Sequence, residues 1–443
     1  MSVTTNACKL CAPLGACLAF RGVAGAMPFL HGSQGCSTYI RRYMIGHFRE
    51  PMDIGSSNFG EQAAVFGGSD NFIVGINNII KQYDPAIIGV ATTCLSETIG
   101  DDMTVLIAQL REQADGPLPP LVHVSTPSYA GTHAEGFHRT VRALVEQLAR
   151  PGYRGRHVVL MPGMVSPTDL RYLREILQSF DVPPVLLPDY SDSLDGPTWQ
   201  EHHRIPEGGT TLEEIAATGC AGAAIGFGET LPPEQQAGSL LAKRFDVPYH
   251  AMDLPIGVRA SDRFIAVLAQ ISGNQLPERH VAERGRLLDS YIDGHKYVFG
   301  KKAVIYGEED LVAAMAGFLD EIGMVPAVCG TGGASGRLRA RIEQQLGARA
   351  EDIRICDDTD FDHILAAAEA ADVDLVIGHS KGYWLSRRLQ RPLVRIGFPI
   401  HDRIGGARIA HLGYRGSQEL YDRITNCIIE QQQDGNPVGY MAM

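Results

Sequence analysis

The stretch Pro85-Ala-Ile-Ile-Gly-Val-Ala-Thr-Thr-Cys94 decides the fold class, because it is an unbroken apolar run that ends in a polar loop. Continuous rather than alternating apolar residues are typical of a strand buried on both faces, as in a parallel sheet. Residues 102–112 follow, with apolar side chains at helical spacing at Met103, Leu106, Ile107 and Leu110. The stretch therefore predicts a strand, a loop and a helix in succession.

The same order recurs along the chain, and alternating strands and helices predict repeated βαβ units. We therefore expect an α/β fold of three doubly wound, Rossmann-like αβα domains with parallel sheets. Loop-rich breaks before new strands at Arg150-Pro-Gly-Tyr-Arg-Gly-Arg156 and Phe299-Gly-Lys-Lys302 place the domains at residues 1–150, 151–298 and 299–443. Further strand-like runs start at Leu121, His157, Pro184, Lys302, Val325, Asp352 and Asp374.

Composition excludes several classes of protein. The chain has 443 residues, a formal net charge of −12 and no cluster of Lys and Arg, which argues against nucleic acid or an anionic membrane surface as partner. The N-terminal residues lack the basic and apolar regions of a signal peptide, and no run of about 18 apolar residues occurs. Nine cysteines form an odd number in a long chain, so a disulfide framework is a poor interpretation. We expect a cytoplasmic protein.

Three cysteines, Cys11, Cys36 and Cys94, each stand in a loop where a strand is expected to give way to a helix. Their separations are too long for one tight loop, as in a zinc ribbon, so the thiols must come from different strand–helix units. Loops that follow parallel strands meet at the carboxyl edge of the sheet. Converging thiolates hold soft metals and iron–sulfur clusters, and the alternative is a set of inert core thiols.

A helix expected over residues 37–48 adds to this interpretation, because its N-terminal amides favour an anionic cluster near Cys36. Cys8 and Cys11 form a C-x-x-C pair, which leaves a redox dithiol or half of a zinc site open. Two Gly-rich turns, Gly330-Thr-Gly-Gly-Ala-Ser-Gly336 and Gly378-His-Ser-Lys381, could cradle an anion, but a tight structural turn is favoured for both. The chain carries no P-loop motif.

Taken together, these loops resemble those of the β-type subunits of nitrogenase component 1, the NifK/NifN-like family. The first 135 or so residues carry most of the resemblance, and three later segments are more similar to NifN than to NifK. The matching stretches are Cys11-Ala-Pro-Leu-Gly-Ala, Met27-Pro-Phe-Leu-His-Gly-Ser-Gln-Gly-Cys36, His47-Phe-Arg-Glu-Pro51, Ala64-Val-Phe-Gly-Gly68, Thr92-Thr-Cys94 through Asp102, Thr126-Pro-Ser128, Leu187-Pro-Asp-Tyr-Ser-Asp-Ser-Leu-Asp-Gly196, Ile271-Ser-Gly-Asn274 and Gly413-Tyr-Arg-Gly416.

The resemblance implies metal ligands. At positions matching Cys11, Cys36 and Cys94, the family holds half of an eight-iron P-cluster shared with an α-type subunit, and a serine matching Ser128 can join when the cluster is oxidised. Arg49 and Glu50 match a place where a cation lies between β-type subunits, with a solvated charge pair as the alternative. Cys8 is outside the family pattern and leaves a four-iron cluster or another ligand set open.

The resemblance also implies partners and an activity. We expect a heterotetramer of two α-type and two β-type subunits, reduced by a separate ATP-dependent Fe protein. The activity implied is a nitrogenase-like reductase in which this chain relays electrons and the α-type subunit holds the reacting cofactor. Full cluster ligands on a NifN-leaning chain favour reductive carbon–sulfur cleavage, as in methylthio-alkane reductases. The alternative is a NifN-type scaffold for assembling the iron–molybdenum cofactor.

Overall fold

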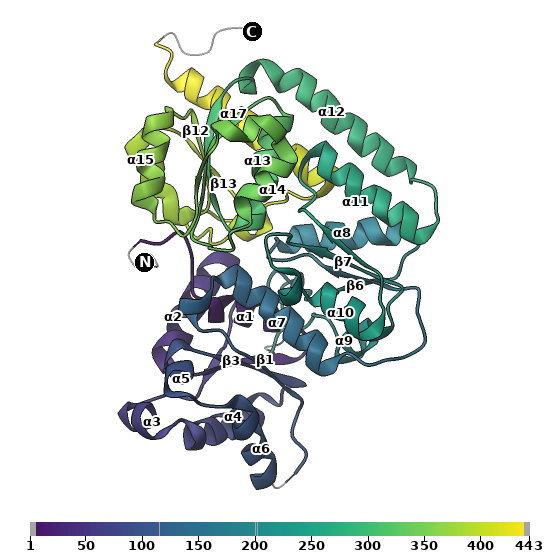
Figure 1. Ribbon diagram of the computed structural model, residues 1–443, viewed down its shortest axis with the longest axis vertical. Helices are drawn as coiled ribbons and strands as arrows, with labels where there is room; N and C mark the ends of the chain where they lie inside the picture. The colour runs from purple at the N-terminus through teal and green to yellow at the C-terminus, as the bar shows by residue number, and fades with distance from the viewer. Residues whose placement is uncertain (1–5, 115, 200, 202, 438–443) are drawn as a thin grey trace.

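The computed structural model describes residues 6–114, 116–199, 201 and 203–437. Three stacked units, each with its own sheet, follow one another from the bottom to the top of Figure 1. Every strand pairing within the three sheets is parallel. The expected α/β fold with parallel sheets is thereby confirmed. The exact domain boundaries at residues 150 and 298 stay a prediction.

The N-terminal unit has the strand order β2-β1-β3-β4. Its two central strands are buried along their whole length, as their unbroken apolar sequences predict. The strands are β1 (Ala26–His31), β2 (Gly55–Ser56), β3 (Ile87–Thr92) and β4 (Leu121–Val124). The helices are α1 (Ala12–Arg21), α2 (Gln34–Phe48), α3 (Glu61–Phe66), α4 (Ser69–Tyr83), α5 (Cys94–Ile99), α6 (Met103–Gln113) and α7 (His133–Leu148), with the short helix η1 (Ser128–Ala130) before α7.

The middle unit has the strand order β6-β5-β7-β8. Its first helix begins with Ser166 capping the amide of Asp169 and Pro167 in the first turn, both of which favour a helix start. The strands are β5 (Val158–Met161), β6 (Pro184–Leu186), β7 (Ala223–Phe227) and β8 (Tyr249–Met252). The helices are α8 (Pro167–Ser179), α9 (Leu212–Ala217), α10 (Ala237–Phe245), α11 (Gly257–Ser272) and α12 (Glu278–Val298).

The C-terminal unit has the strand order β11-β10-β9-β12-β13. Its last helix, α17, returns to pack along α12 and α11 of the middle unit (Figure 1). The strands are β9 (Lys302–Gly307), β10 (Val325–Thr331), β11 (Arg354–Cys356), β12 (Leu375–Gly378) and β13 (Leu393–Arg395). The helices are α13 (Glu309–Glu321), α14 (Leu338–Leu346), α15 (Phe361–Ala371), η5 (Ser380–Gly382), α16 (Tyr383–Leu389) and α17 (Gly413–Asp434).

Residues 6–11 tie the C-terminal unit to the first helix. Ala7 forms an isolated antiparallel bridge with Asp360, and the Cys8 amide donates to the Thr359 carbonyl at 3.1 Å. The Cys8 carbonyl in turn accepts from the Gly332 amide at 3.1 Å. This strap places Cys11 directly before α1 and fixes it from the C-terminal side.

Sequence patterning located the helices to within a few residues. The helix expected over residues 37–48 begins earlier, at Gln34, because Ser33 has the extended backbone of an N-cap. The helix expected over residues 102–112 begins at Met103, because the Asp102 carboxylate caps the amides of Thr104 and Val105. In the described part of the chain, no helix is both long and apolar enough to cross a bilayer.

Candidate metal centre

Each of the three candidate cysteines lies at the start of a helix. Cys11 is the N-cap of α1, Cys36 stands in the first turn of α2, and Cys94 is the first residue of α5. The last two helices directly follow β1 and β3, which are neighbours in the sheet. The Thr93 hydroxyl, just before Cys94, donates to the His31 carbonyl at the end of β1 at 3.1 Å. The loops that carry Cys36 and Cys94 therefore lie against each other.

Cys11 reaches the same edge by a different route. The helix α1 packs on β1, β3 and α2, and it leads into β1 through a short turn. Because a helix that feeds directly into a strand packed beneath it must run antiparallel to that strand, its N-terminus points to the carboxyl edge of the sheet. The structure thus brings the three cysteine-bearing segments to one edge of the N-terminal sheet.

Exposure separates these cysteines from the core thiols. Cys11 and Cys36 are exposed and Cys94 is half-buried, whereas Cys8, Cys17 and Cys329 are buried. Burial raises the pKa of the Cys8 and Cys329 thiols to about 12, and it raises the pKa of Cys17 as well. A metal ligand must be a thiolate, so these buried thiols are poor ligands. The exposed ones keep the access that a metal centre needs.

Neighbouring groups contact two of the candidate sulfurs. The Ser33 hydroxyl lies 3.6 Å from the Cys36 Sγ, in donor geometry. The backbone amide of Ser128 donates to the Cys94 Sγ at 3.2 Å. Ser128 begins η1 in the loop after β4. Because of this hydrogen bond, Ser128 lies beside Cys94 although 34 positions separate them in the sequence. The sequence-based association of Ser128 with this group matches its location, while its role as a ligand stays a prediction.

The donor set does not suit a single metal ion. Among the residues that the structure describes, no three His, Cys, Asp or Glu side chains form a group that could hold one ion. Two exposed thiols and one half-buried thiol on separate helix starts suit a cluster instead, because each ligand of a cluster binds a different metal atom. The residues present therefore fit a shared iron–sulfur cluster.

Cys8 does not join the candidate group. Its side chain is 2% exposed and packs in the core of the C-terminal unit with Tyr306 and Phe361. The Lys381 ammonium lies nearby and donates to the carbonyls of Ala7 and Lys9 at 2.9 and 3.0 Å. With one thiol buried and the other exposed, the C-x-x-C pair has the character of a structural strap rather than of a redox dithiol.

Arg49 and Glu50 point to different partners. The Arg49 guanidinium donates to the His401 carbonyl of the C-terminal unit at 2.7 Å. Burial and the nearby Asp195 carboxylate raise the pKa of Glu50, which Arg408 partly offsets. Glu50 therefore belongs to a small charged group with Asp195 and Arg408. Its role in holding a cation stays a prediction.

Polar groups of the two Gly-rich turns form hydrogen bonds to other parts of the protein. The Gly332 amide binds the Cys8 carbonyl, and the Ser335 amide donates to the Glu309 carboxylate at 3.0 Å. In the second turn, the Ser380 amide donates to the Pro399 carbonyl at 3.0 Å. These contacts agree with the structural interpretation of both turns.

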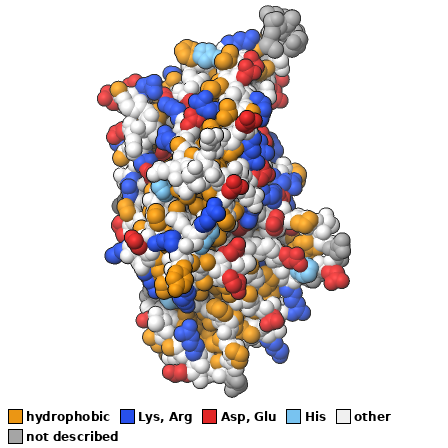
Figure 2. Space-filling model, turned by 90° about the vertical axis from the view of Figure 1, so that its right-hand side faces the viewer, with side chains coloured by type: hydrophobic (Ala, Val, Ile, Leu, Met, Phe, Trp, Pro, Cys, Tyr) orange, Lys and Arg blue, Asp and Glu red, His pale blue; other side chains and the backbone are white. Residues whose placement is uncertain are grey.

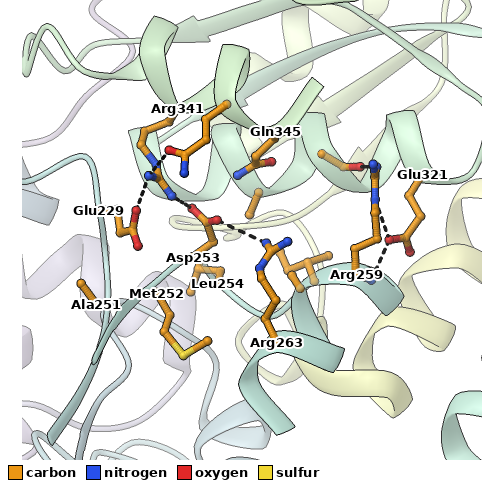
Figure 3. A pocket seen from close by; sticks show the side chains of 15 residues that line it. Glu229, Ala251, Met252, Asp253, Leu254, Arg259, Arg263, Glu321, Arg341 and Gln345 are labelled. Atoms are coloured by element: carbon orange, nitrogen blue, oxygen red, sulfur yellow. Dashed lines mark hydrogen bonds and ion pairs between the residues drawn. The ribbon is translucent and has the colours of Figure 1, made fainter. Parts of the chain in front are cut away.

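A cavity of about 300 Å³ opens between the middle and C-terminal units, beyond the ends of β7 and β8 (Figure 3). The Arg341 guanidinium spans Glu229 and Asp253, while Arg259 pairs with Glu321. Arg263 points toward Asp253 from α11, at 3.4 Å. The acids and arginines that line the cavity neutralise one another, so its charge selects no ligand.

Sequence reasoning missed the carboxylate of Glu97. It lies in the first turn of α5 and accepts from the hydroxyls of Thr92 and Ser125 at 2.5 and 2.6 Å. It also missed a buried acidic run, Glu308 to Asp310, which lines a cavity of about 190 Å³ with Cys8 and His138. Burial and Asp310 raise the pKa of Glu308 to about 8. Neither group has a motif, because the contacts come from distant segments.

Hydrophobic side chains gather over the lower part of the molecule in Figure 2, where the N-terminal unit lies. Large exposed apolar side chains of this unit include Leu95 next to Cys94, Tyr129 next to Ser128, and the strongly exposed Phe66 at 85%. Contiguous exposed apolar surface is a feature of interfaces with other proteins. The thiols thus belong to the unit with the most apolar face in view.

The chain is similar to known proteins along nearly its whole length. A family model described as nitrogenase component 1 type oxidoreductase matches residues 11–429. The nitrogenase molybdenum-iron protein beta chain of Clostridium pasteurianum is 36% identical over 96% of this chain and 93% of that protein. The nitrogenase iron-molybdenum cofactor biosynthesis protein NifN of Nostoc sp. is 32% identical over 98% of this chain and 95% of that protein. A solved structure described as nitrogenase Cp1 at pH 6.5 is similar with a TM-score of 0.95 and 34% identity, covering 100% of this chain and 97% of that one.

Proposed function

The chain belongs to the nitrogenase component 1 family, as a β-type or NifN-like subunit, and on this premise we propose that it relays electrons through an iron–sulfur cluster. Cys11, Cys36 and Cys94 supply this chain's share of the ligands, with Ser128 beside Cys94. The observation that carries the proposal is the placement of three thiols, two exposed and one half-buried, on helix starts at one sheet edge. Such a cluster accepts and passes on single electrons.

This chain's residues prepare the site in two ways. The first turn of α2, a helix of 15 residues, presents backbone amides near Cys36, which favours anionic sulfur. The Ser128 amide donates to the Cys94 sulfur, and N–H donors to sulfur stabilise the more negative, reduced state of a cluster. The fold therefore stabilises negative charge where the thiolates stand.

The missing ligands imply a partner. We propose an α-type subunit that completes the cluster against the exposed face of the N-terminal unit, in a heterotetramer of two subunits of each type. An ATP-dependent Fe protein supplies the electrons, in keeping with a chain that carries no P-loop. The substrate is reduced on the α-type subunit. A NifN-leaning chain with all three cysteines favours carbon–sulfur cleavage, as in methylthio-alkane reductases.

Cys94→Ala tests the cluster. In the complex purified through this chain, we expect the variant to lose most of its iron and its electron paramagnetic resonance signal, while its melting temperature stays close to that of the wild type. Cys220→Ala, in the middle unit, is the matched control and should keep its iron. Unchanged iron in Cys94→Ala would contradict the ligand assignment.

The second candidate function is a NifN-type scaffold for cofactor assembly, which the 32% identity to the Nostoc protein favours. The two functions differ in turnover. With its Fe protein and loaded cofactor, a reductase complex consumes ATP and reduces volatile organic sulfur compounds repeatedly. A scaffold instead passes a bound cluster to an apo-enzyme once and shows no turnover.

A further inference from the structure

We propose that Glu97 is a positioning residue that sets the hydrogen bond from the Ser128 amide to the Cys94 sulfur. The inference rests on the proposed function, because it concerns the same cluster ligand. Glu97 lies three residues after Cys94, one turn along α5, and its side chain is half-buried. The family motif covers the position of Glu97 only within a longer stretch and does not specify its contacts. These contacts are seen in the structure.

The Glu97 carboxylate joins two strands of the sheet. One oxygen, Oε1, accepts from the Thr92 hydroxyl at the end of β3 at 2.5 Å and from the Ser125 hydroxyl after β4 at 2.6 Å. The last ladder pair of these strands is Ala91 with Val124, so both hydroxyls lie one step beyond the ladder. The carboxylate therefore continues the pairing of β3 with β4 where the backbone ladder has ended.

A second pair of contacts carries this coupling on to the next residue. The Thr126 amide donates to the Thr92 hydroxyl at 2.9 Å, and the Thr126 hydroxyl donates to the Thr92 carbonyl at 2.7 Å. Thr92 and Thr126 are both buried. The Thr92 hydroxyl thus accepts from one segment and donates to Glu97, which fixes its proton and its rotamer.

The network ends at the sulfur. Two residues after Thr126, the Ser128 amide donates to the Cys94 Sγ at 3.2 Å. Cys94 is held from the other side by the capping box of α5, in which the Thr93 amide donates to the Ser96 hydroxyl at 2.9 Å. A carboxylate that accepts two hydroxyl hydrogen bonds makes charge-assisted contacts, which are stronger than neutral ones. Glu97 is thereby the acceptor on which the distance between the amide and the sulfur depends.

The expected effect is on the reduction potential. An N–H donor to a cluster thiolate stabilises the reduced state, so a loosened Ser128 loop favours the oxidised state. For Glu97→Ala, we expect the reduction equilibrium to shift about tenfold toward the oxidised cluster. For a one-electron couple, this shift makes the reduction potential about 59 mV more negative. Glu97→Gln loses the same charge but keeps an acceptor oxygen, so its potential should be less negative than that of Glu97→Ala.

The test is a redox titration of the whole complex, followed by electron paramagnetic resonance. Glu112→Ala, an exposed acid on α6 of the same unit, controls for the loss of a surface charge. Ser125→Ala removes one donor and leaves the carboxylate in place, so it should shift the potential in the same direction by less. This milder variant keeps the test decisive if Glu97→Ala does not fold.

The outcomes separate the two proposals. A wild-type complex without iron overturns the proposed function itself. If the wild-type complex holds iron and both Glu97→Ala and Ser125→Ala keep the wild-type potential, only the positioning role is overturned. A merely structural role would lower the melting temperature of Glu97→Ala and Glu97→Gln alike without moving the potential of either.

Discussion

Burial separates Cys11 and Cys36 from the core thiols of this chain. The side chains of Cys11 and Cys36 are exposed, whereas Cys8 is 2% exposed and its pKa is raised to about 12. A thiol with a pKa that high stays protonated at neutral pH and is a weak nucleophile and ligand. Proximity in sequence therefore says little here, since Cys8 and Cys11 differ by three positions and belong to opposite groups.

Cys8→Ala is expected to leave the iron content of the complex unchanged. The change removes one sulfur atom from a packed core, which should lower the free energy of unfolding by about 1 kcal/mol. Iron quantitation and a denaturant titration measure both effects. A loss of iron as large as that of Cys94→Ala would show that Cys8 is a ligand after all.

At the scale of elements, one carboxylate holds two helix starts together. Asp169, in the first turn of α8, accepts from the amides of His411 and Leu412, which directly precede α17, at 3.0 Å each. Its other oxygen lies 2.9 Å from the His411 Nδ1. Both side chains are buried, so the pair joins the middle unit to the C-terminal unit inside the protein.

The pair predicts a pH dependence of stability. Burial opposes the charge of both groups, but their contacts outweigh it. Asp169 raises the pKa of His411 above 6.5, and the contacts from His411 and Leu412 lower the pKa of Asp169 below 3.8. The stabilisation from the raised pKa of His411 is present below pH 6.5 and is lost as the pH rises through the folded pKa of His411. The stabilisation from the lowered pKa of Asp169 is present above pH 3.8 and is lost as the pH falls through the folded pKa of Asp169. Both contributions are present between these limits.

His411→Gln should therefore lower the melting temperature more at pH 6 than at pH 9. Removing one member of a buried pair costs about 3 kcal/mol, and the share that depends on the histidine charge disappears at the higher pH. His363→Gln, which breaks an exposed pair with Asp360, is the control and should change stability by less than about 0.5 kcal/mol. Equal losses at both pH values would rule out a charged His411.

At the scale of the whole molecule, the strap of residues 6–11 joins the first and last units. The Lys381 ammonium is the centre of this contact, since it donates to two strap carbonyls and lies 6.0 Å from the centroid of the Phe361 ring. Burial lowers the pKa of Lys381, and the nearby thiols of Cys8 and Cys11 oppose that shift. The position of the first candidate ligand therefore depends on a residue from the far end of the chain.

Lys381→Met should loosen the strap without melting the sheets. Two carbonyls lose their donor, at a cost of about 1–3 kcal/mol that is confined to the strap. Hydrogen exchange should show faster exchange of the Cys8 amide, with the strands of the C-terminal sheet unchanged. Lys302→Met is the matched control, because that ammonium binds the Ala371 carbonyl from an exposed position.

The sequence by itself predicted many of the strands and several helices, because unbroken apolar runs and helical spacing are local properties. It predicted no strand at β2, β7, β8 or β13. It also identified Cys11, Cys36 and Cys94 as loop cysteines, although no strand precedes Cys11 in the structure. Ser128 came from the family resemblance, which the comparisons confirm. Which thiols are accessible was decided only by tertiary structure. Cys8 is buried because the strap packs on a sheet formed some 300 residues later, and no local pattern contains that contact.

The contacts of Glu97 were likewise decided by the fold. Its carboxylate binds hydroxyls from the ends of two strands, and one of these hydroxyls lies 28 positions away. The alignment of β3 with β4 brings these groups together, and sequence spacing does not determine that register. Local patterning sets which residues are offered to the sheet edge, and packing sets which of them meet.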